Sequence, residues 1–380
     1  MKLVFLSNFF NHHQRPLSDA FAGMAESFAF IETMPMPPER VQMGYADGER
    51  PAYVLSLQNP MEQTQCEQVL READTVIFGS APEALFRQCL RAGKLLFRYS
   101  ERPLKNGFEL LKYLPRWLRW HWRNPPRKPI WLLCASAYTA SDYAKFGLFR
   151  GRAFRWGYFP PAVRYEDPQQ LFREKDPGKI LWVGRLLELK HPDDALRAAA
   201  LLKKEGYSFS MDLIGGGEME PRLQEMILEN GLSDCVHLLG VMPPDEVRRY
   251  MERAGIFLMT SDRKEGWGAV INEAMNSGCA VISSREAGAA PYLIKDGENG
   301  LMYPAQDLSA LTDHVRHMLE APQRQRELGA AAYKSITTLW NAEIAAERFF
   351  EICQHLLAGQ DAGELYAEGP CSAEKPFAQH

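Results

Sequence analysis

Two glutamates on either side of a glycine turn are the first residues of this sequence that could do chemistry. Glu265 and Glu273 lie in the stretch "DRKEGWGAVINEAMNSG" (262–278), with seven residues between them. This pattern predicts one carboxylate on a loop and the other on the helix that follows. Two ordinary surface acids at a solvated helix entrance would give the same pattern, so the pair alone does not identify a site.

Cations and further glycines follow other strand-like runs of the same half. Arg185 and Lys190 come after the run "KILWVGR", at the end of a strand where ligands bind in an open α/β sheet. The residues that would let backbone approach a ligand closely are Gly184, Gly215, Gly216, Gly217, Gly266 and Gly268, with Trp267 between the last two. Two cations, a glycine turn and a helix N-terminus suit a diphosphate, beside which the glutamates should bind neutral hydroxyl groups.

The elements that must position these residues are strands alternating with helices. Apolar runs at 179–185, 209–216, 235–240, 255–261, 279–284 and 300–304 alternate with helix-patterned segments. Four more runs, at 2–7, 74–80, 94–100 and 129–136, indicate a similar arrangement in the first half. The predicted fold class is α/β, with two doubly wound Rossmann-like domains facing a cleft.

Proline and charge mark the predicted domain boundaries. We expect an N-terminal domain at 1–160, a linker at 161–178 and a C-terminal domain at 179–337. A helix over 338–358 is long enough to cross back onto the first domain. The small and polar residues 359–380 predict a disordered tail.

Composition excludes several classes of protein. The 380 residues carry a net charge of -4 and contain 46% hydrophobic residues, with no apolar run long enough to span a bilayer. The first residues read as a strand rather than a signal peptide, so we expect a cytoplasmic protein. Seven scattered cysteines argue against a disulfide framework or a thiolate metal site, and the acidic balance disfavours nucleic acid as a partner.

Four segments together carry a resemblance. In order, "VGRLLELK", "LIGGGEME", "EGWGAVINEAMNSG" and "DGENGLMYP" resemble the C-terminal domain of retaining GT-B glycosyltransferases of family 4, the group 1 transferases. The likeness covers about residues 179–320 well and the first half only in outline. It implies transfer of a sugar from a nucleotide-diphosphate sugar to an acceptor hydroxyl, with retention of configuration and no cofactor.

The resemblance also implies a role for each donor-site residue. Arg185 and Lys190 would clamp the diphosphate and stabilise the leaving nucleotide, Glu265 would accept hydrogen bonds from the donor sugar, and Glu273 would hold the ribose hydroxyls. Backbone amides of the Gly-Trp-Gly turn would contact the sugar, with the loop at 239–242 near the base.

Other interpretations of these residues stay open. Arg185 and Lys190 could form a surface ion pair with Glu188, the glycines at 215–217 could make a plain tight turn, and Glu273 could lie on a solvated helix face. No DxD-type carboxylate pair stands beside these residues, and two cations can neutralise a diphosphate, so we expect metal-independent transfer.

The first half departs from the family pattern in two places. "SNFFNHHQRP" (7–16) stands where many relatives have a glycine-rich loop, and "YSERP" (99–103) where they often have a histidine. His13 could contact the acceptor or take its proton, and Glu101 could replace the absent histidine. Alternatively, His13 caps a helix and Glu101 forms a salt bridge beside Arg102.

A basic and aromatic stretch, "KYLPRWLRWHWRNPPRKPIW" (112–131), suits an anionic membrane surface. A lipid-linked or membrane-proximal acceptor at the inner membrane face would explain it, whereas a helical hairpin with tryptophans on the core would not need a membrane. We interpret the chain as a glycosyltransferase of cell-surface polysaccharide or glycolipid assembly. The alternatives are a non-catalytic partner subunit with the same fold and a nucleotide-sugar epimerase.

Overall fold

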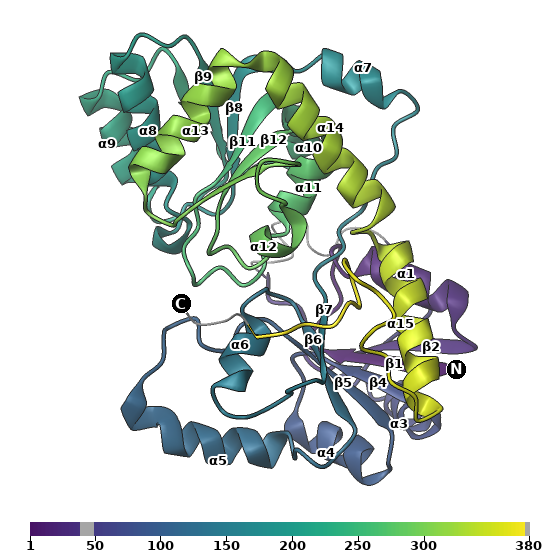
Figure 1. Cartoon of the computed structure of the whole chain (residues 1–380). Coiled ribbons are helices and arrows are strands. Elements are labelled where there is room, and N and C mark those ends of the chain that lie inside the picture. The colour runs from purple at the N-terminus through teal and green to yellow at the C-terminus, as the bar shows by residue number, and fades with distance from the viewer. Residues whose placement is uncertain (39–48, 377–380) are drawn as a thin grey trace. The chain divides into compact units, whose positions relative to one another are not determined.

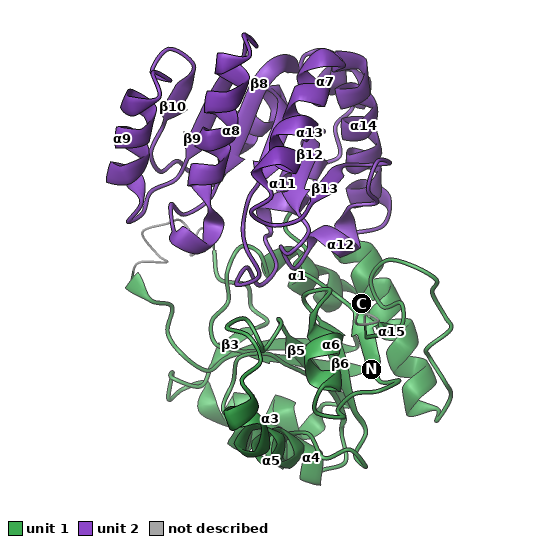
Figure 2. Cartoon of the chain, turned by 60° about the vertical axis from the view of Figure 1, so that its left-hand side comes forward, with its two compact units in different colours: residues 1–161, 341–380 green, residues 162–340 purple. Residues whose placement is uncertain are grey.

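The computed structural model describes residues 1–38 and 49–376, and the chain divides into two compact units. Unit 1 comprises Met1–Pro161 together with the chain from Asn341 onward, and unit 2 is Ala162–Trp340 (Figure 2). The first break falls one residue after the predicted end of the N-terminal domain. Within the described residues, no helix has both the length and the apolar character needed to cross a membrane.

Unit 1 is built on a parallel sheet, for which the described residues give seven strands in the order β3-β2-β1-β4-β5-β6-β7. The strands are β1 (Lys2–Ser7), β2 (Ser27–Glu32), β3 (Val54–Ser56), β4 (Thr75–Phe78), β5 (Leu95–Ser100), β6 (Ile130–Cys134) and β7 (Ala153–Arg155). Central strands such as β4 are buried along their whole length, which is why they read as continuous apolar runs. The four strands expected in this half therefore form, and the structure adds β2, β3 and β7.

Helices cover both faces of this sheet, as expected for a doubly wound unit. They are α1 (Arg15–Met24), α3 (Gln63–Glu72), α4 (Glu83–Arg91), η1 (Leu110–Lys112), α5 (Tyr113–Arg123), α6 (Thr139–Ala144) and α15 (Ala342–Leu357) (Figure 1). The long helix α15, expected to cross back to the first domain, does so. Its Phe349 ring packs 5.4 Å from Phe21 of α1 and 4.8 Å from Phe97 of β5.

The prediction of a disordered tail is wrong for residues 359–376, and residues 377–380 lie outside the described part. Cys371 and Ser372 are buried, and Ala373 forms an antiparallel bridge with Phe154 of β7. The buried carboxylate of Glu374 accepts a hydrogen bond from Arg155 Nε at 2.8 Å. The segment is ordered because it pairs with the open edge of β7, a partner that its own small and polar composition does not reveal.

Unit 2 contains a second parallel sheet, with the strand order β10-β9-β8-β11-β12-β13. Its strands are β8 (Asp176–Val183), β9 (Ser210–Ile214), β10 (Val236–Leu238), β11 (Ala254–Met259), β12 (Ala280–Ser284) and β13 (Leu301–Tyr303). All six were expected from the sequence. Its helices are α7 (Pro168–Arg173), η2 (Glu188–Lys190), α8 (Pro192–Lys204), α9 (Glu220–Glu229), α10 (Pro244–Arg253), α11 (Val270–Asn276), α12 (Ala290–Leu293), α13 (Leu308–Glu320) and α14 (Pro322–Thr338).

The segment predicted as a linker, 161–178, is part of this unit rather than a free connection. It contains α7 and the start of β8. Val163 exchanges two hydrogen bonds with the side chain of Asn276, at 2.8 and 3.0 Å. The proline-rich segment therefore packs against unit 2 and leads into its sheet. Composition alone does not distinguish such a packed segment from a free linker.

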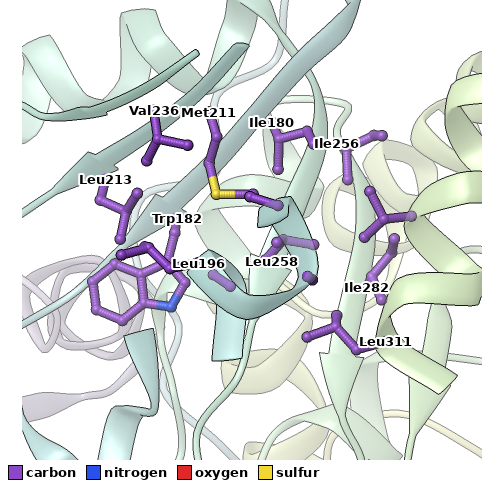
Figure 3. Close-up of a cluster of buried hydrophobic side chains, with 14 of the residues drawn as sticks. Ile180, Trp182, Leu196, Met211, Leu213, Val236, Ile256, Leu258, Ile282 and Leu311 are labelled. Carbon is purple, nitrogen blue, oxygen red and sulfur yellow. The ribbon is translucent and has the colours of Figure 1, made fainter. Parts of the chain in front are cut away.

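The core of unit 2 follows the two-residue period of its strands. Ile180 and Trp182, then Met211 and Leu213, point to the same face of the sheet, where they meet Leu196 of α8 (Figure 3). Burying each such side chain contributes roughly 1.5–3 kcal/mol. This packing holds the strands whose carboxyl ends carry the predicted donor residues.

Candidate functional site

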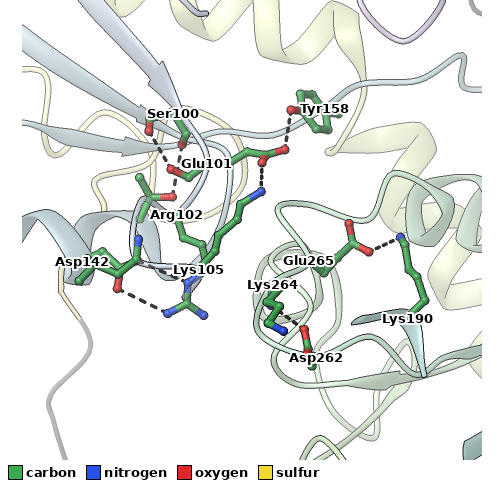
Figure 4. Close-up of polar contacts among 12 residues, drawn as sticks. Ser100, Glu101, Arg102, Lys105, Asp142, Tyr158, Lys190, Asp262, Lys264 and Glu265 are labelled. Carbon is green, nitrogen blue, oxygen red and sulfur yellow. Dashed lines mark hydrogen bonds and ion pairs between the residues drawn. The ribbon is translucent and has the colours of Figure 1, made fainter. Parts of the chain in front are cut away.

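The structure brings Lys190 and Glu265 together at the carboxyl edge of the second sheet. Lys190 ends η2, which follows β8, and Glu265 lies on the loop after β11; the Lys190 ammonium forms an ion pair with the Glu265 carboxylate (Figure 4). Ser261 Oγ donates a second hydrogen bond to the same carboxylate oxygen at 3.2 Å. The two side chains are only 16% and 13% exposed, so the pair is partly shielded from water.

A chain of hydrogen bonds fixes the loop that carries Lys190. The indole N–H of Trp182 donates to Thr260 Oγ1 at 2.9 Å, and Thr260 Oγ1 donates to the carbonyl oxygen of Lys190 at 2.6 Å. The backbone N–H of Asp262 donates to Leu189 O at 2.9 Å, which joins the same two loops again. The position of the ion pair is thus set from the core of the sheet outward.

Arg185 follows β8 and differs from Lys190 because it is exposed. In the part of the chain that the structure describes, its guanidinium has no ion pair, and neither it nor Lys190 pairs with Glu188. The surface ion pair considered as an alternative for these two cations is therefore not formed. An unpaired guanidinium two residues after a sheet strand is available to an anionic ligand.

The glycines at 215–217 are required where loops meet. A Cβ on Gly215 would lie 1.9 Å from the carbonyl oxygen of Gly184, and one on Gly217 would lie 2.5 Å from that of Leu186. The Gly215 N–H donates to Gly240 O at 2.8 Å, and Gly216 O accepts from Leu186 N at 3.0 Å. The glycine turn therefore holds the loop of Arg185 beside the loop at 239–242. The glycines at 215–217 thus have a packing role that does not depend on a ligand.

The Gly-Trp-Gly turn has a buried side chain at its centre. Trp267 is fully buried, and its indole N–H donates to Asn272 Oδ1 at 2.9 Å. Gly268 has φ +92°, and a Cβ there would lie 2.8 Å from the terminal methyl of Met259. Because the indole belongs to the core, only the backbone of Gly266, Trp267 and Gly268 remains for ligand contacts. The helix that follows, α11, has seven residues, so its dipole is small.

Glu273 lies in the first turn of α11 and is partly buried. Burial raises the pKa of its carboxyl group to about 7, while the positive charge of Arg248 acts in the opposite direction. No described residue donates a hydrogen bond to this carboxylate. A carboxylate that is only partly buried, accepts no hydrogen bond from the described residues and lies beside a glycine turn is a candidate for binding hydroxyl donors.

Glu101 follows β5 in unit 1 and is held by two partners. Its carboxylate forms an ion pair with Lys105 and accepts a hydrogen bond from Tyr158 OH at 2.7 Å (Figure 4). Arg102 pairs instead with Asp142, at 3.4 Å. The salt bridge considered for Glu101 thus exists with another partner. Lys105, four residues on, could have been anticipated from its spacing, whereas nothing in the sequence links Tyr158 to this position.

His13 lies in the turn before α1, also in unit 1. Its backbone N–H donates to Asn11 Oδ1 at 3.0 Å, and its ring lies 3.9 Å from that of His12. The N-cap of α1 is Gln14, so His13 does not cap this helix. It follows β1, and both strands whose ends carry His13 and Glu101 belong to the same parallel sheet.

A cavity of about 740 Å³ lies elsewhere in unit 2, between α10 and the starts of β8 and β9. Lys179, Asp212, His237 and Tyr250 line it together with Leu239 of the predicted base loop, and the four charged donor-site residues do not. Among the described residues, no three histidine, cysteine, aspartate or glutamate side chains are grouped as a metal site would need.

Comparison with known proteins agrees with the resemblance of the four motifs. Residues 163–335, almost the whole of unit 2, match the family model of the "Glycosyl transferases group 1". Unit 2 is therefore a domain of the group 1 glycosyltransferase family.

Two relatives are named for polysaccharide synthesis. The amylovoran biosynthesis glycosyltransferase AmsK of Erwinia amylovora is 34% identical over 185 residues, which cover 47% of this chain and 45% of the relative. The putative colanic acid biosynthesis glycosyltransferase WcaL of Escherichia coli is 31% identical over 154 residues, or 39% and 38% of the two chains. In both cases the match spans less than half of the relative's own length.

Solved structures resemble the chain over most of its length. Anabaena HepE, solved with UDP and glucose, matches with a TM-score of 0.67 at 15% identity, covering 93% of this chain and 99% of that one. Sucrose-phosphate synthase of Thermosynechococcus elongatus matches with a TM-score of 0.66 at 16% identity, covering 95% and 100%. At such identities the likeness concerns the fold, which is the GT-B fold of two parallel-sheet α/β domains.

Proposed function

We propose that this protein is a retaining glycosyltransferase that moves a sugar from a nucleotide-diphosphate sugar to an acceptor hydroxyl. The observation that carries the proposal is the Lys190–Glu265 ion pair at the carboxyl edge of the sheet in a group 1 domain, together with Arg185 of the same edge, which has no ion pair among the described residues. Cations and a carboxylate at one edge suit a donor that is anionic at its diphosphate and hydroxyl-rich at its sugar.

In this proposal the two cations act on the leaving group. Arg185 binds the diphosphate and Lys190 stabilises the negative charge that develops as the bond to the sugar breaks. Glu265 accepts hydrogen bonds from sugar hydroxyls and supports the electron-poor anomeric carbon, while Glu273 accepts those of the ribose. A donor phosphate oxygen takes the acceptor proton as the acceptor attacks from the same face, so the configuration is retained. With both cations in place, no metal ion is required.

In this proposal unit 1 binds the acceptor. The acceptor is a growing cell-surface polysaccharide or glycolipid. The names of AmsK and WcaL, two polysaccharide biosynthesis enzymes, support the pathway class, and the UDP bound to HepE supports a nucleotide sugar as donor. We assign Glu101 and His13, both in unit 1, to acceptor binding. The enzyme would work in the cytoplasm at the inner membrane face, with peripheral contact through residues 112–131.

Binding calorimetry with UDP, GDP and ADP tests the donor site without knowledge of the acceptor. One nucleotide should bind the wild type in the micromolar range, and Arg185→Ala should weaken it at least about tenfold, the loss of a charge-assisted hydrogen bond. Arg324→Ala, at an exposed arginine on α14, is the matched control and should bind as the wild type does. Equal affinities for all three proteins would refute the assignment of Arg185, and no binding of any nucleotide would favour a non-catalytic partner subunit.

A further inference from the structure

An apolar stripe on unit 1 is exposed to solvent although its residues are of the kind that proteins bury. η1 and α5 run without interruption from Leu110 to Arg123. Leu110, Leu114, Leu118 and Trp122 recur every four residues, so they lie along one side of this segment. They are 79%, 62%, 56% and 57% exposed, and the adjacent Leu111 is 96% exposed. Single exposed leucines are common, but five large apolar side chains along one helical segment form a patch that indicates a binding surface.

The stripe is not the side by which the helix packs onto its own unit. Tyr113 stacks on Phe146 with ring centroids 5.2 Å apart, and Trp120 packs 4.4 Å from Phe146 and 5.1 Å from Tyr143. Trp120 is buried. The helix thus packs on the core with a different face from the stripe. Of the two tryptophans, Trp120 lies in the core, as the alternative of core tryptophans predicts, and Trp122 does not.

Basic residues flank the apolar stripe. From Lys112 to Lys128 the sequence has six lysines and arginines and no acid. Lys112 and Arg116 both pair with Glu109, at 2.7 and 3.9 Å, so one carboxylate serves two cations. Arg119, on α5, is exposed and has no ion pair in the described part of the chain. The flank therefore keeps a net positive charge.

Trp122 is held in place at the end of the stripe. The guanidinium of Arg87, from α4, lies 3.2 Å from the centroid of its ring and also donates to the Trp122 carbonyl oxygen at 2.8 Å. A cation stacked on the ring keeps a second positive charge beside the exposed indole. Tryptophan next to arginine is the combination that proteins place at the headgroup level of a bilayer.

We propose that η1 and α5 form a docking surface for an anionic lipid bilayer. The leucines and Trp122 would enter the boundary between headgroups and acyl chains, and the flanking cations would contact lipid phosphates. At about 1.5 Å per residue the segment is roughly 21 Å long, and it lies along the surface rather than crossing it. A lipid surface fits better than a protein partner because cations outnumber carboxylates along the stripe: Glu109 and Glu83 pair with three of them, and Arg119 has no ion pair among the described residues. The surface adds a partner to the proposed glycosyltransferase but does not depend on its donor site.

Sedimentation with lipid vesicles tests this surface on the full chain, with no nucleotide present. The wild type should bind vesicles of phosphatidylcholine with a quarter phosphatidylglycerol, bind pure phosphatidylcholine vesicles much less, and lose affinity as salt is raised. Leu114→Ser with Leu118→Ser should reduce binding at least about tenfold, the expected result of losing two inserted side chains. Arg119→Glu should reduce it by more than about fivefold, since losing the contribution of one basic residue, about 1 kcal/mol, already gives about fivefold and the new negative charge adds repulsion.

Matched changes on unit 2 provide the controls. Leu228 of α9 is 64% exposed, and Arg324 of α14 is also exposed, so Leu228→Ser and Arg324→Glu should leave vesicle binding unchanged. Arg185→Ala should bind vesicles like the wild type, whereas the double leucine variant should still bind nucleotide. Failure of the lipid proposal is therefore distinct from failure of the donor site. Equal vesicle binding by the wild type and the α5 variants, or a wild-type dimer that the leucine changes dissociate, would overturn it.

Discussion

At the scale of single residues, the two glutamates of the opening motif have opposite environments. The Glu265 carboxylate is already satisfied by Lys190 and Ser261. Glu273 is partly buried and accepts no hydrogen bond from the described residues, and burial raises its pKa to about 7. A carboxylate held by protein groups must exchange those partners when a ligand binds, whereas one without protein partners has only water to exchange.

The raised pKa of Glu273 gives a prediction with a defined sign. The folded protein holds this proton up to about pH 7, and the unfolded chain releases it near the ordinary value of 4.5. The stabilising effect is therefore complete below pH 4.5 and is lost as the pH rises through 7. In urea unfolding, Glu273→Gln should be about 1–3 kcal/mol more stable than the wild type at pH 8 and equal to it at pH 4.5.

Nucleotide binding gives an independent readout of the same group. Ribose hydroxyls donate to the charged carboxylate, so wild-type affinity should increase relative to Glu273→Gln as the pH rises from 6 to 8. Glu225→Gln, an exposed position on α9, should follow the wild type in both experiments. A constant difference between the wild type and Glu273→Gln across this range would show that the group does not titrate there.

At the scale of elements, three loops at the carboxyl ends of β8, β9 and β10 are packed backbone against backbone. Gly215 touches the carbonyl of Gly184 and donates to that of Gly240. Arg185 follows Gly184 directly, so the direction of its side chain depends on a contact that admits no Cβ. The same backbone contacts of Gly215 therefore pack the three loops together and direct the side chain that we propose binds the diphosphate.

Substitution of Gly215 should reveal this dependence. Gly215→Ala places a Cβ 1.9 Å from a backbone oxygen that cannot rotate away, and should cost about 3 kcal/mol or more of the free energy of unfolding. Gly206→Ala is the control: it has φ +88° but open space around a Cβ, so only backbone strain of about 1 kcal/mol is expected. Urea titration measures both, and similar costs for the two variants would mean that the loops separate easily.

The sequence predicts the central strands of both sheets well. Strands such as β4 and β11 are recognisable because burial on both faces makes them continuously apolar. The three strands that the sequence does not predict are β2, with six residues, and β3 and β7, with three residues each, too few to show a period. The same limit applies to the tail, since Glu374 finds Arg155 across 219 positions of sequence.

For the site, the sequence identifies the residues that belong to ordered motifs but not their partners. Lys190 and Glu265 are 75 positions apart, and their motifs place both after strands of one sheet, so their meeting follows from the fold. By contrast, no motif in the sequence predicts the hydrogen bond from Tyr158 to Glu101. The buried position of Trp267 likewise depends on packing against Tyr292 and Trp340, which no local pattern encodes.

At the scale of the whole molecule, the two units depend differently on the C-terminal part of the chain. Unit 2 contains its own sheet, its own core and all four charged residues of the proposed donor site. Unit 1 is completed only after Asn341, because α15 covers α1 and the segment around Ala373 pairs with β7. Folding of unit 1 therefore requires chain segments that lie on both sides of unit 2 in the sequence.

Residues 162–340 alone should therefore fold and bind the donor nucleotide, but not transfer a sugar. We expect cooperative urea unfolding and a nucleotide affinity within about tenfold of the full chain, because the fragment keeps Arg185, Lys190, Glu265 and Glu273 on an intact sheet. Arg185→Ala should weaken nucleotide binding by the fragment at least about tenfold, as expected for the full chain. By contrast, residues 1–161 alone should unfold without a sharp transition, because Phe21 and Phe97 lose their contacts with Phe349. A fragment of residues 162–340 that folds but binds no nucleotide would mean that unit 1 supplies part of the donor site.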